Sequence, residues 1–405
     1  MAIRHQLPAY SPVSATASLL ATAQALHLGE DSRPRLRALL QKEYDAHSVL
    51  LCGSGTQALT IAIRESMKCV DAKSSVALPA FSCFDVATAA VGADVRISIY
   101  DLDPDTLGPD LKSLERALGE GARVVVVAPL YGIPVDWDEL RTLADRYGAI
   151  LIEDAAQGNG ATWKGRMLGT LGEISVLSFG RGKGWTGGNG GAVLMRGSFE
   201  VSGEELPDIG VSREAESALT LAAQWALGRP ALYGIPASIP GLQLGETVYR
   251  EPRRETAITR AAAATLLATR EDSEREAEMR RVNAERLLAV FTGNAKLRLI
   301  RTQSEGSAGY LRFPIRLSQG MTSLGSESDV LSFGIAPSYP RSLADLPRAA
   351  ERMSRVKRSQ SGAQTLVREL ITVPTHSYLR ERDLAQISAS LTTHSHSSIA
   401  APILK

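Results

Sequence analysis

The sequence AILIEDAAQGNGATWKGRMLGTLGEISVLSF, residues 149–179, contains two mainly apolar runs, AILIEDA at 149–155 and EISVLSF at 173–179. Neither run alternates strictly between apolar and polar residues. Near-continuous apolar runs are typical of parallel strands that are covered on both faces. A sheet with helices on both faces is an α/β layer. The stretch therefore predicts an α/β domain with a largely parallel sheet.

The same pattern continues outward from this stretch, from about residue 50 to residue 200. Helix-like stretches separate several of the strand-like runs, for example TQALTIAIRESMK at 56–68 and DWDELRTLADRYG at 136–148. The further predicted strands are 48–52, 75–79, 94–101, 123–129 and 191–196. This alternation strengthens the prediction of a layered α/β domain.

The C-terminal part of the chain has a different pattern. Residues 200–252 include LGRPALYGIPASIPGLQLG, and their Gly and Pro content predicts a long connection without a core of its own. A long helix is predicted at about 255–291, and strand and helix patterns after it predict a smaller α+β unit. We therefore divide the chain into a large α/β domain at 1–250 and a C-terminal part, the long helix and small domain, at 251–405.

Composition excludes several classes of protein. The 45 basic and 44 acidic residues nearly cancel, so no overall charge favours nucleic acid or an anionic membrane. The N-terminal MAIRHQLPAYSP has no signal-peptide core, and no apolar stretch reaches membrane-spanning length. Three cysteines without a CxxC pair predict a reducing cytoplasm, and six histidines without HExxH spacing predict no metal site.

The turn LCGSGTQAL, at 51–59, is the first of four local signals. A strand ends at glycine and a helix begins at Thr56, so free N–H groups and the positive end of the helix dipole predict a phosphate site. The turn also fits the G-x-G-x-x-A fingerprint of nicotinamide-binding proteins. That fingerprint needs an acid at the end of the next strand, whereas Asp71 follows a helix. A nicotinamide-binding protein is therefore the less favoured alternative.

Two further signals are polar side chains at strand ends. Asp154 ends the first run of the opening stretch, and Gln157 follows it. Ser178 and Lys183 follow the second run on the glycine-rich loop SFGRGKGWTGG. Because ligands of α/β proteins bind at the carboxyl ends of parallel strands, we expect these side chains to share one crevice. Each of them alone has an ordinary interpretation, as a helix cap or a solvated turn residue.

The fourth signal is ALPAFSCFDVATA at 77–89, in which Phe81 or Phe84 could cover the flat face of a bound ring. A ligand with a phosphate, a flat ring, a basic ring nitrogen and an aldehyde would use all four signals, and pyridoxal phosphate has these parts. In this interpretation Lys183 forms the Schiff base and also moves a proton. Asp154 pairs with the ring nitrogen and keeps it protonated.

The chain resembles the DegT/DnrJ/StrS aminotransferases, which are fold-type I pyridoxal-phosphate enzymes that typically aminate keto groups on nucleotide-linked sugars. The most specific block is Glu153–Val193, which has the acid, glutamine, serine and lysine in the order of the family. Other matching stretches are 53–59, 79–95, 99–110, 128–140 and 370–387. The resemblance implies a mostly parallel seven-stranded sheet flanked by helices, a smaller α+β C-terminal domain and a homodimer.

The resemblance also implies roles for single residues. Lys183 would be the Schiff-base lysine, Asp154 the partner of the ring nitrogen, and Gln157 a neighbour of the phenolic oxygen of the ring. Phe84 would stack on the ring, next to Cys83, where the aromatic position of the family falls. The implied phosphate ligands are Ser54, Gly55, Thr56 and Ser178.

Some positions depart from the family pattern. Gly180 replaces a histidine often found ahead of the lysine, a glycine-tyrosine-asparagine stretch has no clear match, and 200–252 cannot be aligned. Arg181 is therefore a candidate for substrate binding. Arg250, in the basic string YREPRRE at 249–255, is a second candidate, and a solvated helix start is the favoured interpretation of that string.

The predicted function is transfer of an amino group, with glutamate as donor, to a keto group of a nucleotide-linked sugar or related metabolite. The partners would thus be small molecules, a donor and a keto substrate. Lys183 excludes the dehydratase branch of the family, which has histidine at this position. Another pyridoxal-phosphate reaction, a lyase or an acyl-condensing synthase, is the alternative within the same cofactor class.

Overall fold

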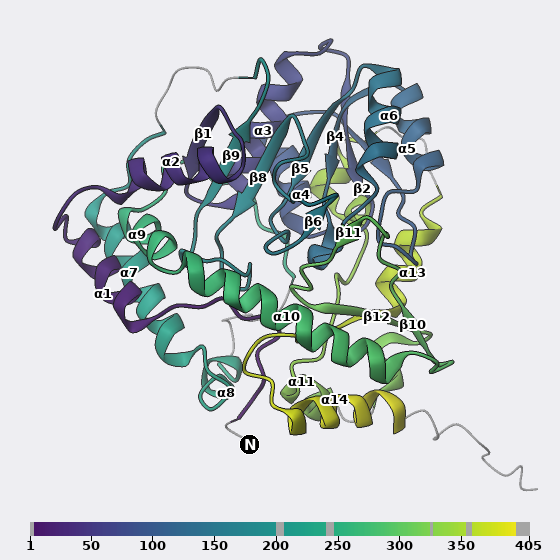
Figure 1. Ribbon diagram of the computed structural model, residues 1–405. Helices are drawn as coiled ribbons and strands as arrows, with labels where there is room; N and C mark the ends of the chain where they lie inside the picture. Colours follow the sequence, from purple (N-terminus) through teal and green to yellow (C-terminus); the bar gives the residue numbers. More distant parts are fainter. Residues whose placement is uncertain (1–3, 200–205, 240–246, 325–326, 354–358, 394–405) are drawn as a thin grey trace, which may run out of the picture.

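The computed structural model describes residues 4–199, 206–239, 247–324, 327–353 and 359–393. Its central sheet has seven strands, and every neighbouring pair is parallel except the two pairs made by β9 (Figure 1). The strand order is β1 (Ser48–Cys52), β9 (Gly191–Met195), β8 (Ile174–Ser178), β5 (Ile150–Asp154), β4 (Ala122–Val127), β2 (Ser75–Pro79) and β3 (Ile97–Tyr100). The predicted α/β class and mostly parallel seven-stranded sheet are confirmed.

Helices cover both faces of this sheet, and β4 shows why. Its side chains alternate, so that Val124 and Val126 enter one hydrophobic cluster while Val125 and Val127 enter another. Both clusters are closed to solvent, as expected for near-continuous apolar strands. Helices α3 (Gly55–Lys68) and α4 (Phe84–Gly92) belong to the first cluster; α2 (Ser32–Glu43), α5 (Leu111–Gly119) and α6 (Trp137–Tyr147) belong to the second.

The segment predicted as a long connection at 200–252 contains a helix, so that prediction is wrong in part. Helix α7 spans Val211–Leu227, and the short α8 spans Gly234–Ala237. The buried residues of α7 follow a helical repeat, Glu214, Ser217, Ala218 and Leu221. The sequence VSREAESALTLAAQWAL has no Pro or Gly, but the Pro and Gly residues after it dominated the prediction. Residues 200–205 and 240–246 lie outside the described residues.

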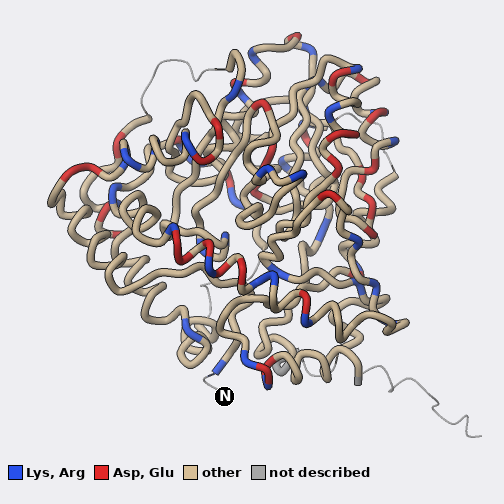
Figure 2. The backbone as a smooth tube through the Cα atoms, viewed as in Figure 1, with Lys and Arg blue, Asp and Glu red and all other residues tan. Residues whose placement is uncertain are grey.

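The helix predicted at 255–291 begins later and is broken. Helix α9 spans Arg260–Ala268 and α10 spans Arg270–Phe291, with Thr269 between them. The alanine-rich α9 packs against α2, α7 and α1 (Ala15–Ala25). Helix α10 carries acidic and basic residues along its length, as Figure 2 shows, and it crosses the front of the molecule in Figure 1.

The C-terminal part forms a second sheet with its own hydrophobic cluster. The strand order is β10 (Leu297–Leu299), β12 (Phe313–Leu317), β14 (Leu370–Val373) and β13 (Ala336–Pro337), all antiparallel. Its helices are α11 (Glu327–Ser332), α12 (Pro347–Ala350), α13 (Ser361–Glu369) and α14 (Glu381–Thr393). The boundary near residue 250 stays a prediction.

A small third sheet connects the two parts of the chain. Strand β11 (Gly306–Ser307) pairs with β6 (Thr162–Trp163), which pairs with β7 (Arg166–Met167). The segment after β5 is therefore attached to the C-terminal part. Among the described helices, none is both long and apolar enough to cross a membrane.

Candidate functional site

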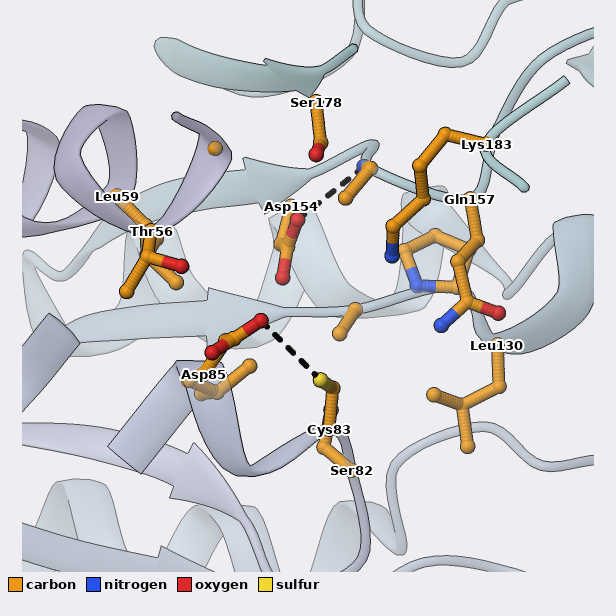
Figure 3. A pocket seen from close by; sticks show the side chains of 15 residues that line it. Thr56, Leu59, Ser82, Cys83, Asp85, Leu130, Asp154, Gln157, Ser178 and Lys183 are labelled. Atoms are coloured by element: carbon orange, nitrogen blue, oxygen red, sulfur yellow. Dashed lines mark hydrogen bonds between the residues drawn. The ribbon is translucent and has the colours of Figure 1, made fainter. Parts of the chain in front are cut away.

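One pocket lies at the carboxyl ends of the parallel strands (Figure 3). It is bordered by the segments that follow β1, β2, β4, β5 and β8, which is the edge where α/β proteins bind ligands. Six of the predicted site residues line it: Gly55, Thr56, Asp154, Gln157, Ser178 and Lys183. The structure thus brings together side chains from widely separated parts of the sequence, as expected.

The turn before α3 has the geometry of an anion cradle. Ser54 is the N-cap, and its side chain accepts a hydrogen bond from the Gln57 N–H at 3.2 Å. The N–H groups of Gly55 and Thr56 belong to the first turn of the helix, where intrahelical acceptors are missing. A Cβ on Gly55 would lie 2.6 Å from Ser178 Oγ, so only glycine allows this close approach. Ser54 shapes the turn but does not line the pocket.

Asp154 is the buried acid of the pocket. One of its oxygens accepts a hydrogen bond from the Ala156 N–H at 3.2 Å. Burial raises the pKa of Asp154, while the positive charge of Lys183 and the Ala156 N–H oppose this increase. Asp85, a second acid lining the pocket, adds to the increase. Figure 3 shows the Lys183 amine directed into the space between Asp154 and Gln157.

The Gln157 side chain is fixed by two tyrosines that were not predicted as site residues. Its Oε1 accepts from the Tyr131 N–H, and its Nε2 donates to the Tyr339 hydroxyl, each at 2.8 Å. Tyr131 has a φ of 57°, an uncommon value for a non-glycine residue and one found often at functional sites. No spacing in the sequence links these three residues, because Tyr339 comes from the C-terminal part.

The lysine loop is held from two sides. The Gly184 N–H donates to Ser11 Oγ at 2.8 Å, which attaches the loop to the N-terminal segment. Gly184 has a φ of 83°, and a Cβ there would lie 2.6 Å from Asn159 Oδ1. Arg280, on α10, donates to the same Asn159 oxygen at 2.7 Å. Glycine is thus required next to Lys183 by both conformation and space.

The structure does not support Phe84 as the residue that covers a bound ring. Phe84 is 4% exposed and belongs to the hydrophobic core, and the residue of this segment that lines the pocket is Cys83. The Cys83 thiol donates to Asp85 Oδ2 at 3.6 Å, and burial raises its pKa to about 12. Phe81 is also buried and packs edge-on against Tyr339. Helix α4 begins at Phe84, and this places the phenyl ring behind the pocket wall.

Arg181 and Arg250 lie outside the pocket. Both are exposed, and the Arg250 carbonyl accepts a hydrogen bond from Thr88 Oγ1 at 2.8 Å. Their predicted roles in substrate binding stay predictions. In the described ranges, no group of three or more His, Cys, Asp or Glu side chains could hold a metal ion.

The pocket residues fit pyridoxal phosphate. Gly55, Thr56 and Ser178 form a cradle for its phosphate, and Asp154 and Lys183 line the rest of the pocket with the acid and amine that the cofactor needs. The aromatic cover expected for the ring is missing from the lining residues, since Cys83 stands there.

The comparisons with known proteins agree with this assignment. The DegT/DnrJ/EryC1/StrS aminotransferase family matches residues 15–228, more than half of the chain. A similar protein is the L-glutamine:2-deoxy-scyllo-inosose aminotransferase of Streptomyces kanamyceticus, 34% identical over 39% of this chain and 37% of that protein. The protein with the same name from Streptoalloteichus tenebrarius is 37% identical over 35% of this chain and 33% of its own length. The matches thus span less than half of these relatives.

Solved structures resemble nearly the whole chain. The sugar aminotransferase CalS13 from Micromonospora echinospora has a TM-score of 0.73 at 19% identity and covers 95% of this chain and 98% of its own. AtS13 from Actinomadura melliaura has a TM-score of 0.74 at 20% identity, and the match covers 96% of this chain and 98% of AtS13. At these identities the likeness establishes the fold.

Proposed function

We propose, on the premise that the chain belongs to the DegT/DnrJ/EryC1/StrS aminotransferase family, that it transfers an amino group to a ketone. The proposed acceptor is a nucleotide-linked sugar or a related polyhydroxylated ring, and the proposed donor is glutamate. One observation carries the proposal. Lys183 and Asp154 line the same pocket as an anion cradle built from Gly55, Thr56 and Ser178.

Membership in the family supports the predicted enzyme class and its cofactor, pyridoxal phosphate. Gly55, Thr56 and Ser178 would hold the phosphate, Asp154 the ring nitrogen and Lys183 the aldehyde carbon. When bound, the cofactor supplies an electron sink for the bond that breaks at the substrate α-carbon. Asp154 keeps the ring nitrogen protonated, which requires its ionised form.

Lys183 has a second role as a proton carrier. With the cofactor bound and its own amine free, Lys183 would be placed to take a proton from the substrate carbon and to return it elsewhere. The apolar side chains of Leu59, Val86 and Leu130 line the pocket and reduce the access of water. Gln157, held by Tyr131 and Tyr339, keeps a fixed amide beside the ring position.

The identity of donor and acceptor is the finer part of the proposal. The curated relatives are named for L-glutamine and 2-deoxy-scyllo-inosose, so glutamine and a carbocyclic ketone belong in any test beside glutamate and a nucleotide-linked keto sugar. A lyase or an acyl-condensing synthase remains the alternative reaction at the same cofactor.

The proposed assembly is a homodimer. Large apolar side chains are exposed on α1 and α7, including Leu19 and Leu219, each 71% exposed, and also Leu20 and Val211. The two helices lie side by side (Figure 1). Exposed apolar patches on a folded protein often mark an interface, and a second copy of this chain is the occupant we propose. The cytoplasmic location stays a prediction from the cysteine pattern.

The experiment that tests the function uses the purified full-length protein and pyridoxal phosphate. We expect a visible absorption band that Lys183→Ala abolishes and that Lys164→Ala, an exposed lysine outside the pocket, retains. Borohydride reduction followed by peptide mass spectrometry should find the cofactor on Lys183. Addition of glutamate or glutamine should remove the band and release the corresponding oxo acid.

Two results would contradict the proposal. A wild-type protein without the band, or a Lys183→Ala variant with an unchanged band, would refute cofactor binding at this site. A band that neither amino acid changes would leave the cofactor in place but favour the lyase or synthase reaction.

A further inference from the structure

We propose that Arg280, on the long helix α10, is a positioning residue for the Lys183 amine and that it acts through Asn159. This inference rests on the proposed function, because it gives Arg280 a task in the reaction of Lys183 with the cofactor. Sequence patterning placed Arg280 only within a long predicted helix at about 255–291 and gave it no role at the site.

The Arg280 side chain is fully buried, and it donates hydrogen bonds to oxygen atoms of two loops. Its Nη2 donates to Asn159 Oδ1 at 2.7 Å and to the Asn159 carbonyl at 2.9 Å. Its Nε donates to the Gly309 carbonyl at 3.2 Å. Burial lowers the pKa of Arg280 to about 10, so the guanidinium is still charged at neutral pH and acts only as a donor. One buried cation therefore fixes both oxygens of Asn159.

Stability alone explains this arrangement poorly. The three acceptors of Arg280 are neutral oxygens, and its Nη1 is buried without a hydrogen-bond partner among the described residues. A buried cation that no carboxylate contacts directly costs free energy of folding, and the charge of Glu276, one helical turn earlier, offsets only part of this cost. What Arg280 holds in place is therefore the better explanation of its position.

The Asn159 side chain lies against the lysine loop. A Cβ on Gly184, the residue after Lys183, would lie 2.6 Å from Asn159 Oδ1 and 2.9 Å from Asn159 Cβ. The oxygen that Arg280 holds is thus also the atom nearest to this point of the loop. If the Asn159 amide turned, the loop would have to move, and Lys183 would move with it.

Gly309 connects the same guanidinium to a second side of the pocket. The Gly309 N–H donates to the Gly132 carbonyl at 2.9 Å. Gly132 follows Tyr131, whose N–H donates to Gln157 Oε1 at 2.8 Å. A Cβ on Gly309 would lie 2.6 Å from the Asn159 carbonyl oxygen, so the two segments that the guanidinium holds also contact each other. The lysine side and the glutamine side of the pocket therefore share one anchor.

Helix α10 packs directly on this loop, and it runs along the boundary between the two parts of the chain (Figure 1). Gly160 has a φ of 82°, and a Cβ there would lie 2.5 Å from the Cβ of Ala277 on α10. The adjacent Arg281 donates to the Gly160 carbonyl at 2.8 Å and pairs with Glu278. Arg281 thus holds only backbone of the loop, whereas Arg280 also holds the side chain that contacts the lysine loop.

The proposed reaction needs a lysine that is held in place. The Lys183 amine must reach the aldehyde carbon of the cofactor and, when free, the substrate carbon. A displacement of about 1 Å can lower the rate of such a step about a hundredfold. The loop GRGKGWTGG, at 180–188, is rich in glycine, so its own backbone is poorly restrained. Asn159 and Arg280 supply the restraint from outside the loop.

The test measures how fast the cofactor-free, full-length protein forms its visible band after pyridoxal phosphate is added. At saturating cofactor the rate reports the placement of the Lys183 amine, and the concentration that gives half of this rate reports the phosphate cradle. We expect Arg280→Met to lower the saturating rate by about tenfold or more and to leave the half-saturating concentration within about threefold. Arg281→Met is the matched control and should keep the wild-type rate within about threefold, because its side chain does not contact Asn159.

Asn159→Ala tests the route by which Arg280 acts. This variant should also lower the saturating rate, and the double variant with Arg280→Met should be no slower than the slower single variant, because both substitutions interrupt one chain of contacts. Reductions that multiply in the double variant would overturn the action through Asn159. A saturating rate equal to that of wild type in Arg280→Met would overturn the positioning role altogether.

Thermal unfolding separates this inference from other failures. A lower melting temperature of Arg280→Met with an unchanged saturating rate would mean a purely structural role and overturn the inference. If Arg280→Met does not fold, Arg280→Lys takes its place, since lysine keeps the charge but has no planar fork for the Asn159 oxygens. This variant should also be slower than wild type, and a wild-type rate would contradict the inference. A wild-type protein without the band would instead refute the proposed function.

Discussion

Glu153 and Asp154 are neighbouring acids at the end of β5, and they differ in how many hydrogen bonds the chain donates to them. Glu153 is fully buried and accepts hydrogen bonds from three backbone groups of the loop before β8 and from one side chain of β8: Gly169 N at 2.6 Å, Leu171 N at 2.8 Å, Gly172 N at 3.2 Å and Ser175 Oγ at 2.9 Å. Asp154 accepts from the Ala156 N–H and lines the pocket.

The difference follows from the pleat of the strand. Successive side chains of a strand point to opposite faces. Glu153 therefore points towards residues 169–175, and Asp154 points into the ligand crevice. Glu153 is fully hydrogen-bonded within the chain, and we infer that it serves the fold. Asp154 keeps acceptor capacity for a ligand.

Loss of the Glu153 carboxylate should destabilise the fold more than any other change considered below. Glu153→Ala leaves several buried donors without an acceptor and leaves the positive charge of Arg196 nearby without its opposing charge. We expect a loss of about 3–5 kcal/mol in the free energy of unfolding, measured by urea denaturation. Glu173→Ala, at a half-buried acid just before β8, is the control and should lose clearly less. An equal loss of unfolding free energy in the two variants would contradict the structural role that we assign to Glu153.

Asp154→Asn removes the negative charge of the second acid, the one that lines the pocket. We expect a decrease in kcat on the order of 10²–10³-fold, because the ring nitrogen loses its charged partner where charge develops during the reaction. Unfolding of the cofactor-free variant should require at least as much urea as wild type does. A variant that keeps its activity but unfolds more easily would reverse the proposed division of roles.

Two glycines, one beside each acid's surroundings, have no space for a side chain. A Cβ on Gly172 would meet Glu153 N at 2.9 Å and Ile174 O at 2.6 Å, whereas a Cβ on Gly55 would meet Ser178 in the cradle. Overpacking costs about 1–3 kcal/mol. We expect Gly172→Ala to lower the free energy of unfolding by this amount. Gly55→Ala should chiefly weaken the binding of pyridoxal phosphate, by about tenfold or more, as measured by absorption titration. Cofactor affinity that is reduced equally in both variants would contradict the separation.

The stability of the cofactor-free protein should depend on pH, with a smaller effect than those of the substitutions above. Burial raises the pKa of Asp154, partly offset by Lys183, so the folded cofactor-free protein holds this proton more tightly than the unfolded chain. Ionised Asp154 then reduces stability at neutral pH, and this cost disappears as the pH falls through the raised pKa. The stability advantage of Asp154→Asn over wild type should therefore shrink on acidification. An advantage that grows towards acid would mean that the pKa is lowered.

Much of the site could be predicted because its residues follow strand ends. Runs such as SVLLC and AILIED identify strands through their apolar side chains, and in a parallel α/β sheet the ends of these strands meet at one edge. That rule was enough to place Asp154, Ser178 and Lys183 in one crevice. It also placed the turn at Gly55 beside them.

Phe84 shows where such reasoning fails. An aromatic residue near a strand end could face the pocket or the core, and one residue of helix register decides between them. Since α4 begins at Phe84, the ring turns into the core and Cys83 takes the position in the lining. Similarly, α7 was hidden by the Gly and Pro residues that follow it, and Thr269 interrupts a helical pattern that looks continuous.

The strands of the large sheet, the order of the phosphate, acid and lysine signals, and the family could all be predicted from the amino-acid sequence, because they depend on local hydrophobic patterns and on spacing within one domain. The contact between Tyr339 and Gln157, by contrast, exists only in the folded protein, where the Gln157 amide donates to the Tyr339 hydroxyl at 2.8 Å. This contact joins the segment after β13 to the large sheet. Pairings between distant segments depend on how two sheets pack, and no local pattern encodes that packing.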